Sequence, residues 1–227
     1  MATTVGKYAR YGAIVIWVIV GGWMARATAG ELHTLWMVLP KPPEAYQDFT
    51  VRNAKDDQGR RTSFRILLFT DEFRWRMNSY DDVGHGNARP HFTDEMKAVL
   101  NSARAVICVG ASSEEIPAGT SFAAGRQIEE RRAALRAEKI AVWVREVLQQ
   151  PIPVRKLNVG HHSPTGQDET SDQRRVVIIL VLDQDEGADI DQALRSAMAG
   201  ESVRAPIFEA LLTKYSLGSG SSFTWVP

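Results

Sequence analysis

Four short segments between residues 64 and 182, three of which are apolar runs, are expected to form β-strands. They cover residues 64–69, 105–110, 154–160 and 176–182. The runs 105–110 and 176–182 carry no polar side chain, which predicts strands that are covered on both faces of a sheet. The run 176–182 has the strongest strand composition and is expected to be central.

Segments with helical spacing of apolar residues follow and separate these runs. A helix is expected over residues 93–101, with an inner face of Met96, Val99 and Leu100. The longest helix is expected over residues 123–148, with an apolar stripe of Ala133, Ala134, Ala137, Ile140, Ala141, Val144, Val147 and Leu148. Two more helices are expected after the last strand, one ending before Gly200 and one starting at Pro206.

The most apolar segment lies near the N-terminus, at residues 11–29, and its only charge is Arg26. As a helix rising about 1.5 Å per residue it spans roughly 28 Å, close to the hydrocarbon thickness of a bilayer. Lys7 and Arg10 precede the segment. This distribution predicts a transmembrane helix with a cytoplasmic N-terminus and export of everything after Gly30.

A cleaved signal peptide is the main alternative for residues 11–29, because Ala27-Thr28-Ala29 has the small-x-small form of a cleavage site. We favour the anchor, since Arg26 interrupts the cleavage region and the apolar stretch is long for a signal. A buried core helix is a weaker interpretation, because the segment is apolar on all sides. The anchor and the signal peptide both imply that the rest of the chain is exported.

The order strand, helix, strand, long helix, strand, strand and helices predicts an α/β sandwich built on a mixed sheet. A turn is expected at residues 56–59, but residues 44–63 predict no helix or strand. The predicted division of the chain is therefore a cytoplasmic N-terminus (1–10), a transmembrane helix (11–29), a linker (30–63), an α/β domain with C-terminal helices (64–217) and a flexible tail (218–227).

The charge and the cysteine content of the chain argue against some classes of function. The 27 basic and 27 acidic residues cancel, so the chain has no overall field that would hold nucleic acid, and no nucleic-acid partner is expected. The single cysteine, Cys108, lies inside an apolar run and is expected to be a buried hydrophobe rather than a nucleophile.

The sequence contains only weak signals of catalytic or metal-binding residues. Residues 118–124 (AGTSFAA) are similar to the nucleophile-serine motif of subtilisin-like proteases, but Ser121 lacks suitably placed histidine and aspartate partners and is expected to cap a helix. His161 and His162 are adjacent and have no paired ligands at zinc spacing. We therefore expect no enzyme activity, no metal site and no cofactor.

A longer pattern covers residues 93 to about 182. It consists of the strand and turn VICVGASS at 106–113, Arg136-Ala137 on the long helix, Val159-Gly160 at the end of a strand, and the signature Gln173-Arg174-Arg175-Val176. In this order the elements resemble the OmpA-like domain, the module by which envelope proteins hold peptidoglycan. The resemblance implies an OmpA-like type of α/β sandwich.

The resemblance also implies a ligand site for the diaminopimelate of the stem peptide. The family binds the ammonium with an aspartate after the first of these strands and the carboxylate with an arginine on the long helix. In this chain the aspartate position falls on Ser113, with Glu114 adjacent, and the arginine position falls on Arg136. With Arg174 and Arg175 of the signature, these residues are the candidate peptidoglycan site. Arg136 is expected at the border of the apolar stripe, held by packing yet reachable.

Two functions follow from the anchor and the resemblance. The first is a non-catalytic protein of the bacterial inner membrane, single-pass, whose periplasmic OmpA-like domain tethers or scaffolds with weak or altered peptidoglycan binding. The second keeps the fold but drops the glycan, so that the domain is a protein-interaction subunit of a membrane complex. The expected partners are the membrane, peptidoglycan and other envelope proteins.

Overall fold

A six-stranded mixed sheet is the centre of the molecule. The computed structural model describes residues 46–69, 73–84, 92–163, 170–199 and 223–225. The strands run in the order β1-β2-β5-β3-β4-β6, and β3 and β4 are parallel while the other neighbours are antiparallel. Their bounds are β1 Tyr46–Lys55, β2 Arg61–Phe69, β3 Ala105–Ser112, β4 Val154–His161, β5 Val177–Gln184 and β6 Phe223–Trp225.

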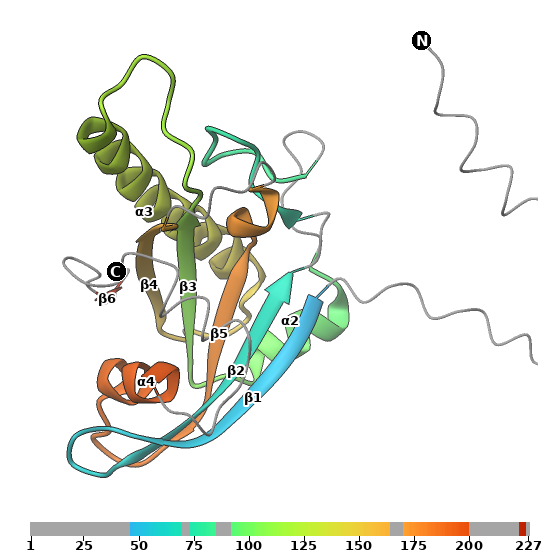
Figure 1. Cartoon of the computed structure of the whole chain (residues 1–227). Coiled ribbons are helices and arrows are strands. Elements are labelled where there is room, and N and C mark those ends of the chain that lie inside the picture. Colours follow the sequence, from blue (N-terminus) through green and yellow to red (C-terminus); the bar gives the residue numbers. More distant parts are fainter. Residues whose placement is uncertain (1–45, 70–72, 85–91, 164–169, 200–222, 226–227) are drawn as a thin grey trace, which may run out of the picture. The chain divides into compact units, whose positions relative to one another are not determined.

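Helices cover both faces of this sheet (Figure 1). On one face, α2 (Asp94–Asn101) and α3 (Phe122–Val147) share a core with residues such as Val106 and Ile178. On the other face, α4 (Ile190–Ala199) packs in a core with residues such as Ile107 and Ile179. Alternate residues of β3 and β5 therefore enter different cores, as the period of two along a strand requires. The α/β class with a mixed sheet is confirmed.

The strongest sequence patterns correspond to real elements. β3 is buried at every position, and β5 is an inner strand between β2 and β3, as expected for runs with no polar residue. Thr93 caps α2 by accepting a hydrogen bond from the Met96 amide at 3.2 Å. Gly110 lets α3 approach β3 closely, because a Cβ atom there would lie 1.9 Å from the Ala133 carbonyl oxygen.

The expected linker is wrong for residues 46–63. Most of these residues form the antiparallel hairpin of β1 and β2, joined by the turn at residues 56–59. The pattern did not predict β1 because a bulge between Val51 and Ala54, with Asn53 at φ 57°, breaks the alternation of apolar and polar residues. β1 is also an edge strand, so its outward positions are polar.

The expected flexible tail is wrong for residues 223–225, because β6 pairs with β4. Three residues are too few for a periodic pattern to predict a strand. The predicted membrane segment (11–29) and the helix from Pro206 lie outside the described residues. Within the residues that the structure describes, no helix is both long and apolar enough to cross a membrane.

Asp56 joins the β1–β2 hairpin to the start of α4. Its carboxylate accepts hydrogen bonds from the amides of Gln58, Arg60 and Asp189 at 2.9–3.0 Å and from Arg60 Nε at 2.7 Å. Burial by itself would raise the pKa of Asp56, but these hydrogen bonds outweigh burial and lower the pKa to about 2. The ionised carboxylate therefore stabilises the folded state.

We expect Asp56→Asn to lower the unfolding temperature at neutral pH. The folded-state pKa of Asp56 lies below its ordinary value, so the stabilisation is present above about pH 4 and is lost as the pH falls towards 2. The difference between wild type and variant should shrink over that range in thermal unfolding followed by circular dichroism. Asp57→Asn is the control, because Asp57 is exposed and only its backbone amide donates to Gln192. An equal effect of both substitutions would contradict the role of Asp56.

Candidate ligand-binding site

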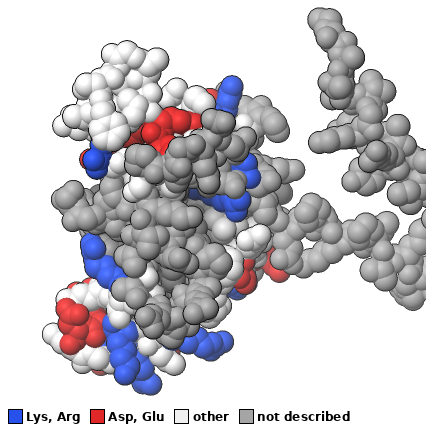
Figure 2. Space-filling view, viewed as in Figure 1, with Lys and Arg blue, Asp and Glu red and all other residues white. Residues whose placement is uncertain are grey.

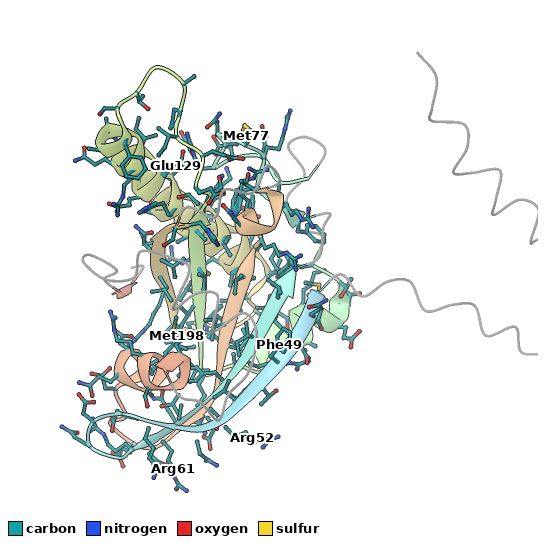
Figure 3. The ribbon with its side chains drawn as sticks, in the orientation of Figure 1. Phe49, Arg52, Arg61, Met77, Glu129 and Met198 are labelled. Atoms are coloured by element: carbon teal, nitrogen blue, oxygen red, sulfur yellow. The ribbon has the colours of Figure 1, made fainter. Side chains whose placement is uncertain are left out.

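The five candidate ligand residues lie near the edge of the sheet where β2, β3 and β4 end and β5 begins. Three connections meet there: the loop 73–84 that follows β2, the loop 113–121 that follows β3, and the segment before β5 with the short 3-10 helix η2 (Ser171–Arg174). Figure 3 shows the side chains at this edge, with Met77 on the loop 73–84 and Glu129 on α3 labelled.

Arg136 is fully buried, so the expectation that it stays reachable is wrong. Its guanidinium donates to the Ser79 carbonyl oxygen from Nε at 2.9 Å and from Nη2 at 2.8 Å. It also donates to the carbonyl oxygens of Ala111 at 2.7 Å and Arg76 at 3.4 Å. The side chain lies 5.5 Å from the centre of the Trp75 ring, within cation–π range. Backbone oxygens thus hold the guanidinium where the resemblance implies a ligand carboxylate.

Arg174 makes a second set of contacts at the same edge. Its Nη1 donates to both carboxylate oxygens of Glu115 at 2.8 and 2.9 Å, and its Nε donates to the Trp75 carbonyl oxygen at 3.1 Å. The Trp75 amide in turn donates to the Arg174 carbonyl oxygen at 2.8 Å. Arg174 is therefore a buried link between the loops 73–84 and 113–121.

Ser113 and Glu114 lie beside this ion pair but differ in role. Ser113 is buried and donates from Oγ to Glu115 Oε2 at 2.6 Å. The Glu114 amide donates to Gln173 Oε1 at 2.9 Å, while its carboxylate lies 4.0 Å from His162 Nδ1. Ser113 and Arg174 are thus brought together through Glu115, whereas the carboxylate of Glu114 lies beside His162.

Glu115 was not predicted from the sequence, although it is central to the site. Partial burial would raise its pKa, but hydrogen bonds from Ser113, Thr170 and Arg174, with the charge of Arg174, outweigh burial and lower the pKa. Glu115 is therefore a carboxylate whose charge is already balanced. In the sequence, the only sign of Glu115 is that it is a second acidic residue directly after Glu114. This sign does not reveal its partner Arg174, which is 59 positions away.

Side chains of the loop 73–84 are buried against α3 and the core at the end of the sheet. Trp75 is 1% exposed and stacks on Trp143 of α3, with ring centres 5.4 Å apart and planes at 14°. Val83 is also buried and forms an antiparallel bridge with Trp75. Arg175 lies opposite Arg74 in another such bridge at the base of the loop. The loop 73–84 is therefore held against α3 and the end of the sheet by buried side chains.

In the described part of the chain, Ser121, Cys108 and His161 have structural surroundings. Ser121 Oγ accepts from the Ala124 amide at 3.3 Å and caps α3, as expected. Cys108 is fully buried, and burial raises the pKa of its thiol. His161 is also buried, and its pKa is lowered by burial and by the nearby charge of Arg126. Within the described residues, no three His, Cys, Asp or Glu side chains are grouped as metal ligands.

Comparison with known proteins adds no assignment. No protein-family model matches the chain, and no curated protein sequence matches it. The interpretation of the site therefore depends on its geometry.

We expect Arg136→Ala to destabilise the fold by about 2 kcal/mol or more, since a buried acceptor left without a donor costs about 1–3 kcal/mol. The buried Ala111 carbonyl oxygen loses this donor, and so do the part-buried carbonyl oxygens of Ser79 and Arg76. Thermal unfolding of the full chain in detergent measures the loss. Arg131→Ala is the control, because Arg131 is exposed on the same helix and exposed substitutions usually change stability by about 0.5 kcal/mol or less. Equal unfolding temperatures would refute the structural role of Arg136.

Proposed function

We propose that the chain is a non-catalytic, membrane-anchored envelope protein whose α/β domain acts as a protein-interaction or scaffold part of a membrane complex. Of the two functions expected from the sequence, this is the one without peptidoglycan binding. The observation that carries the choice is the burial of Arg136, whose guanidinium is bonded to the chain's own carbonyl oxygens.

An OmpA-like fold is part of the proposal. In its support, residues 94–184 contain a helix, a strand, a long helix and two further strands in the order that the resemblance implies. The mixed sheet with helices packed on it also agrees with that fold. Agreement in element order concerns the fold alone, and one fold can serve several functions.

Both charges that a zwitterionic ligand needs are already used inside the protein. The carboxylate of a ligand requires a free guanidinium, but backbone carbonyls of Ser79 and Ala111 hold Arg136. The ammonium requires a free carboxylate, but Ser113 is neutral and Glu115 is paired with Arg174. The carboxylate of Glu114 is mostly buried beside His162. A stem peptide would have to displace the packed loop 73–84 before it met the guanidinium of Arg136.

The cellular setting of the proposal comes from the N-terminal segment. In the proposal, residues 11–29 are the single inner-membrane anchor and the α/β domain lies in the periplasm. The apolar length of the segment and the basic residues before it support this setting. A domain in this position cannot bind the stem peptide through Arg136. Its proposed function is therefore contact with other envelope proteins.

We expect the full chain, kept in mild detergent, to show no diaminopimelate-sensitive binding to isolated cell-wall sacculi. Free meso-diaminopimelate competes only for a site that recognises the stem peptide, so the bound fraction should be unchanged by an excess of it. The test uses a competitor instead of an Arg136 variant. The variant is expected to be less stable, so a loss of binding by it would not show that Arg136 contacts the ligand. Release of the protein from sacculi by diaminopimelate would overturn the proposal.

We also expect the chain to remain in the membrane pellet after alkaline extraction, because a nineteen-residue apolar segment can span a bilayer. Mass spectrometry of the mature protein provides an independent check. A mature N-terminus at Gly30 would show that residues 1–29 are removed as a signal and would refute the anchor.

A further inference from the structure

An uncharged projection extends from the molecule between β3 and α3. Residues 116–125 (IPAGTSFAAG) contain no charged side chain, although about one residue in four of the chain is charged. Residues 118, 119 and 121–124 are exposed. In Figure 2 this segment forms the white knob at the upper left, with acidic side chains at its base. We refer to residues 116–125 as the knob.

The knob is held in one shape by its own contacts. Thr120 donates from Oγ1 to the Pro117 carbonyl oxygen at 2.6 Å, and its amide donates to the same oxygen at 3.2 Å. Ile116 packs against the backbone of Gly125 so closely that a Cβ atom there would lie 2.4 Å from Ile116 Cγ2. With Ser121 capping α3, these contacts order the knob before any partner binds, which lowers the entropic cost of binding.

Phe122 is the largest side chain on the knob, and 57% of it is exposed. The guanidinium of Arg126 lies over its ring at 5.8 Å from the centre. Single exposed apolar residues are common on protein surfaces. Phe122 differs because it stands on an ordered projection that has no charged residue of its own, so that docking there desolvates mainly an aromatic ring.

We propose that the knob inserts Phe122 into an uncharged, apolar socket on another protein of the envelope complex. This inference rests on the proposed interaction function and names the surface that carries it. The flanking charges favour a protein over a lipid surface. Glu114 and Glu115 precede the knob and Arg126 follows it, so its flanks lack the excess of basic residues that anionic lipids attract.

A site-specific photo-crosslinker tests the socket without disturbing Phe122. The photoreactive residue replaces exposed Ala118 in the full chain, expressed in its own membrane, and a second chain carries it at Val142 as control. Val142 is an exposed apolar residue of α3 that lies outside the knob. We expect one discrete protein adduct from position 118 that Phe122→Ser abolishes and Phe122→Leu preserves. No adduct, an adduct with lipid alone, an adduct with a second copy of the chain, or the same adduct from position 142 overturns the proposal.

Affinity measured with the purified adduct partner completes the test. Aromatic anchors of interfaces dominate binding energy, so Phe122→Ser should weaken the complex about tenfold or more. Phe122→Leu should weaken it less, and Val142→Ser should leave it unchanged. An equal affinity of the Phe122→Ser and Val142→Ser proteins would overturn the proposal. Because Phe122→Ser leaves Arg136 intact, the diaminopimelate test on sacculi reports separately on the proposed loss of peptidoglycan binding.

Discussion

The burial of one guanidinium, that of Arg136, constrains the whole edge of the sheet where β3 ends. An unsolvated cation is costly inside a protein unless hydrogen bonds replace its water. In this chain the replacements are backbone oxygens of Ser79, Arg76 and Ala111, which come from a loop and a strand far apart in sequence. The loop 73–84 must therefore stay against α3 and β3 for the helix to keep its arginine buried.

Two further features of the molecule depend on this arrangement. Gly110 permits α3 to lie close enough to β3 for Arg136 to reach the Ala111 carbonyl. Arg174 holds the other side of the loop through Trp75 and is itself neutralised by Glu115. A pair of arginines that would suit an anionic ligand on an open surface instead joins three connections of the fold. In the proposed function, interaction with partners falls to other surfaces, and one of these is the ordered knob, which begins within the loop 113–121.

How far the sequence predicts this fold depends on the length and regularity of each pattern. The runs that became β3 and β5 are apolar without interruption, and α3 has an apolar stripe over many turns, so each was predicted closely. β1 escaped prediction because a bulge shifts its register, and β6 because three residues carry no period. The partners of Arg136 and Arg174 escaped because they include main-chain oxygens, which every residue has and no motif marks.

The sequence by itself therefore determined the α/β class, the inner strands, the long helix and the caps at Thr93 and Ser121, since these depend on local periodicity and on side chains a few residues apart. It also placed Arg136 on the long helix and Ser113 directly after a strand. Only the tertiary structure decided whether those side chains meet a ligand or the protein itself. That outcome depends on which carbonyls and carboxylates the folded chain brings within hydrogen-bond distance, and contacts such as Arg174 with Glu115 join residues 59 positions apart.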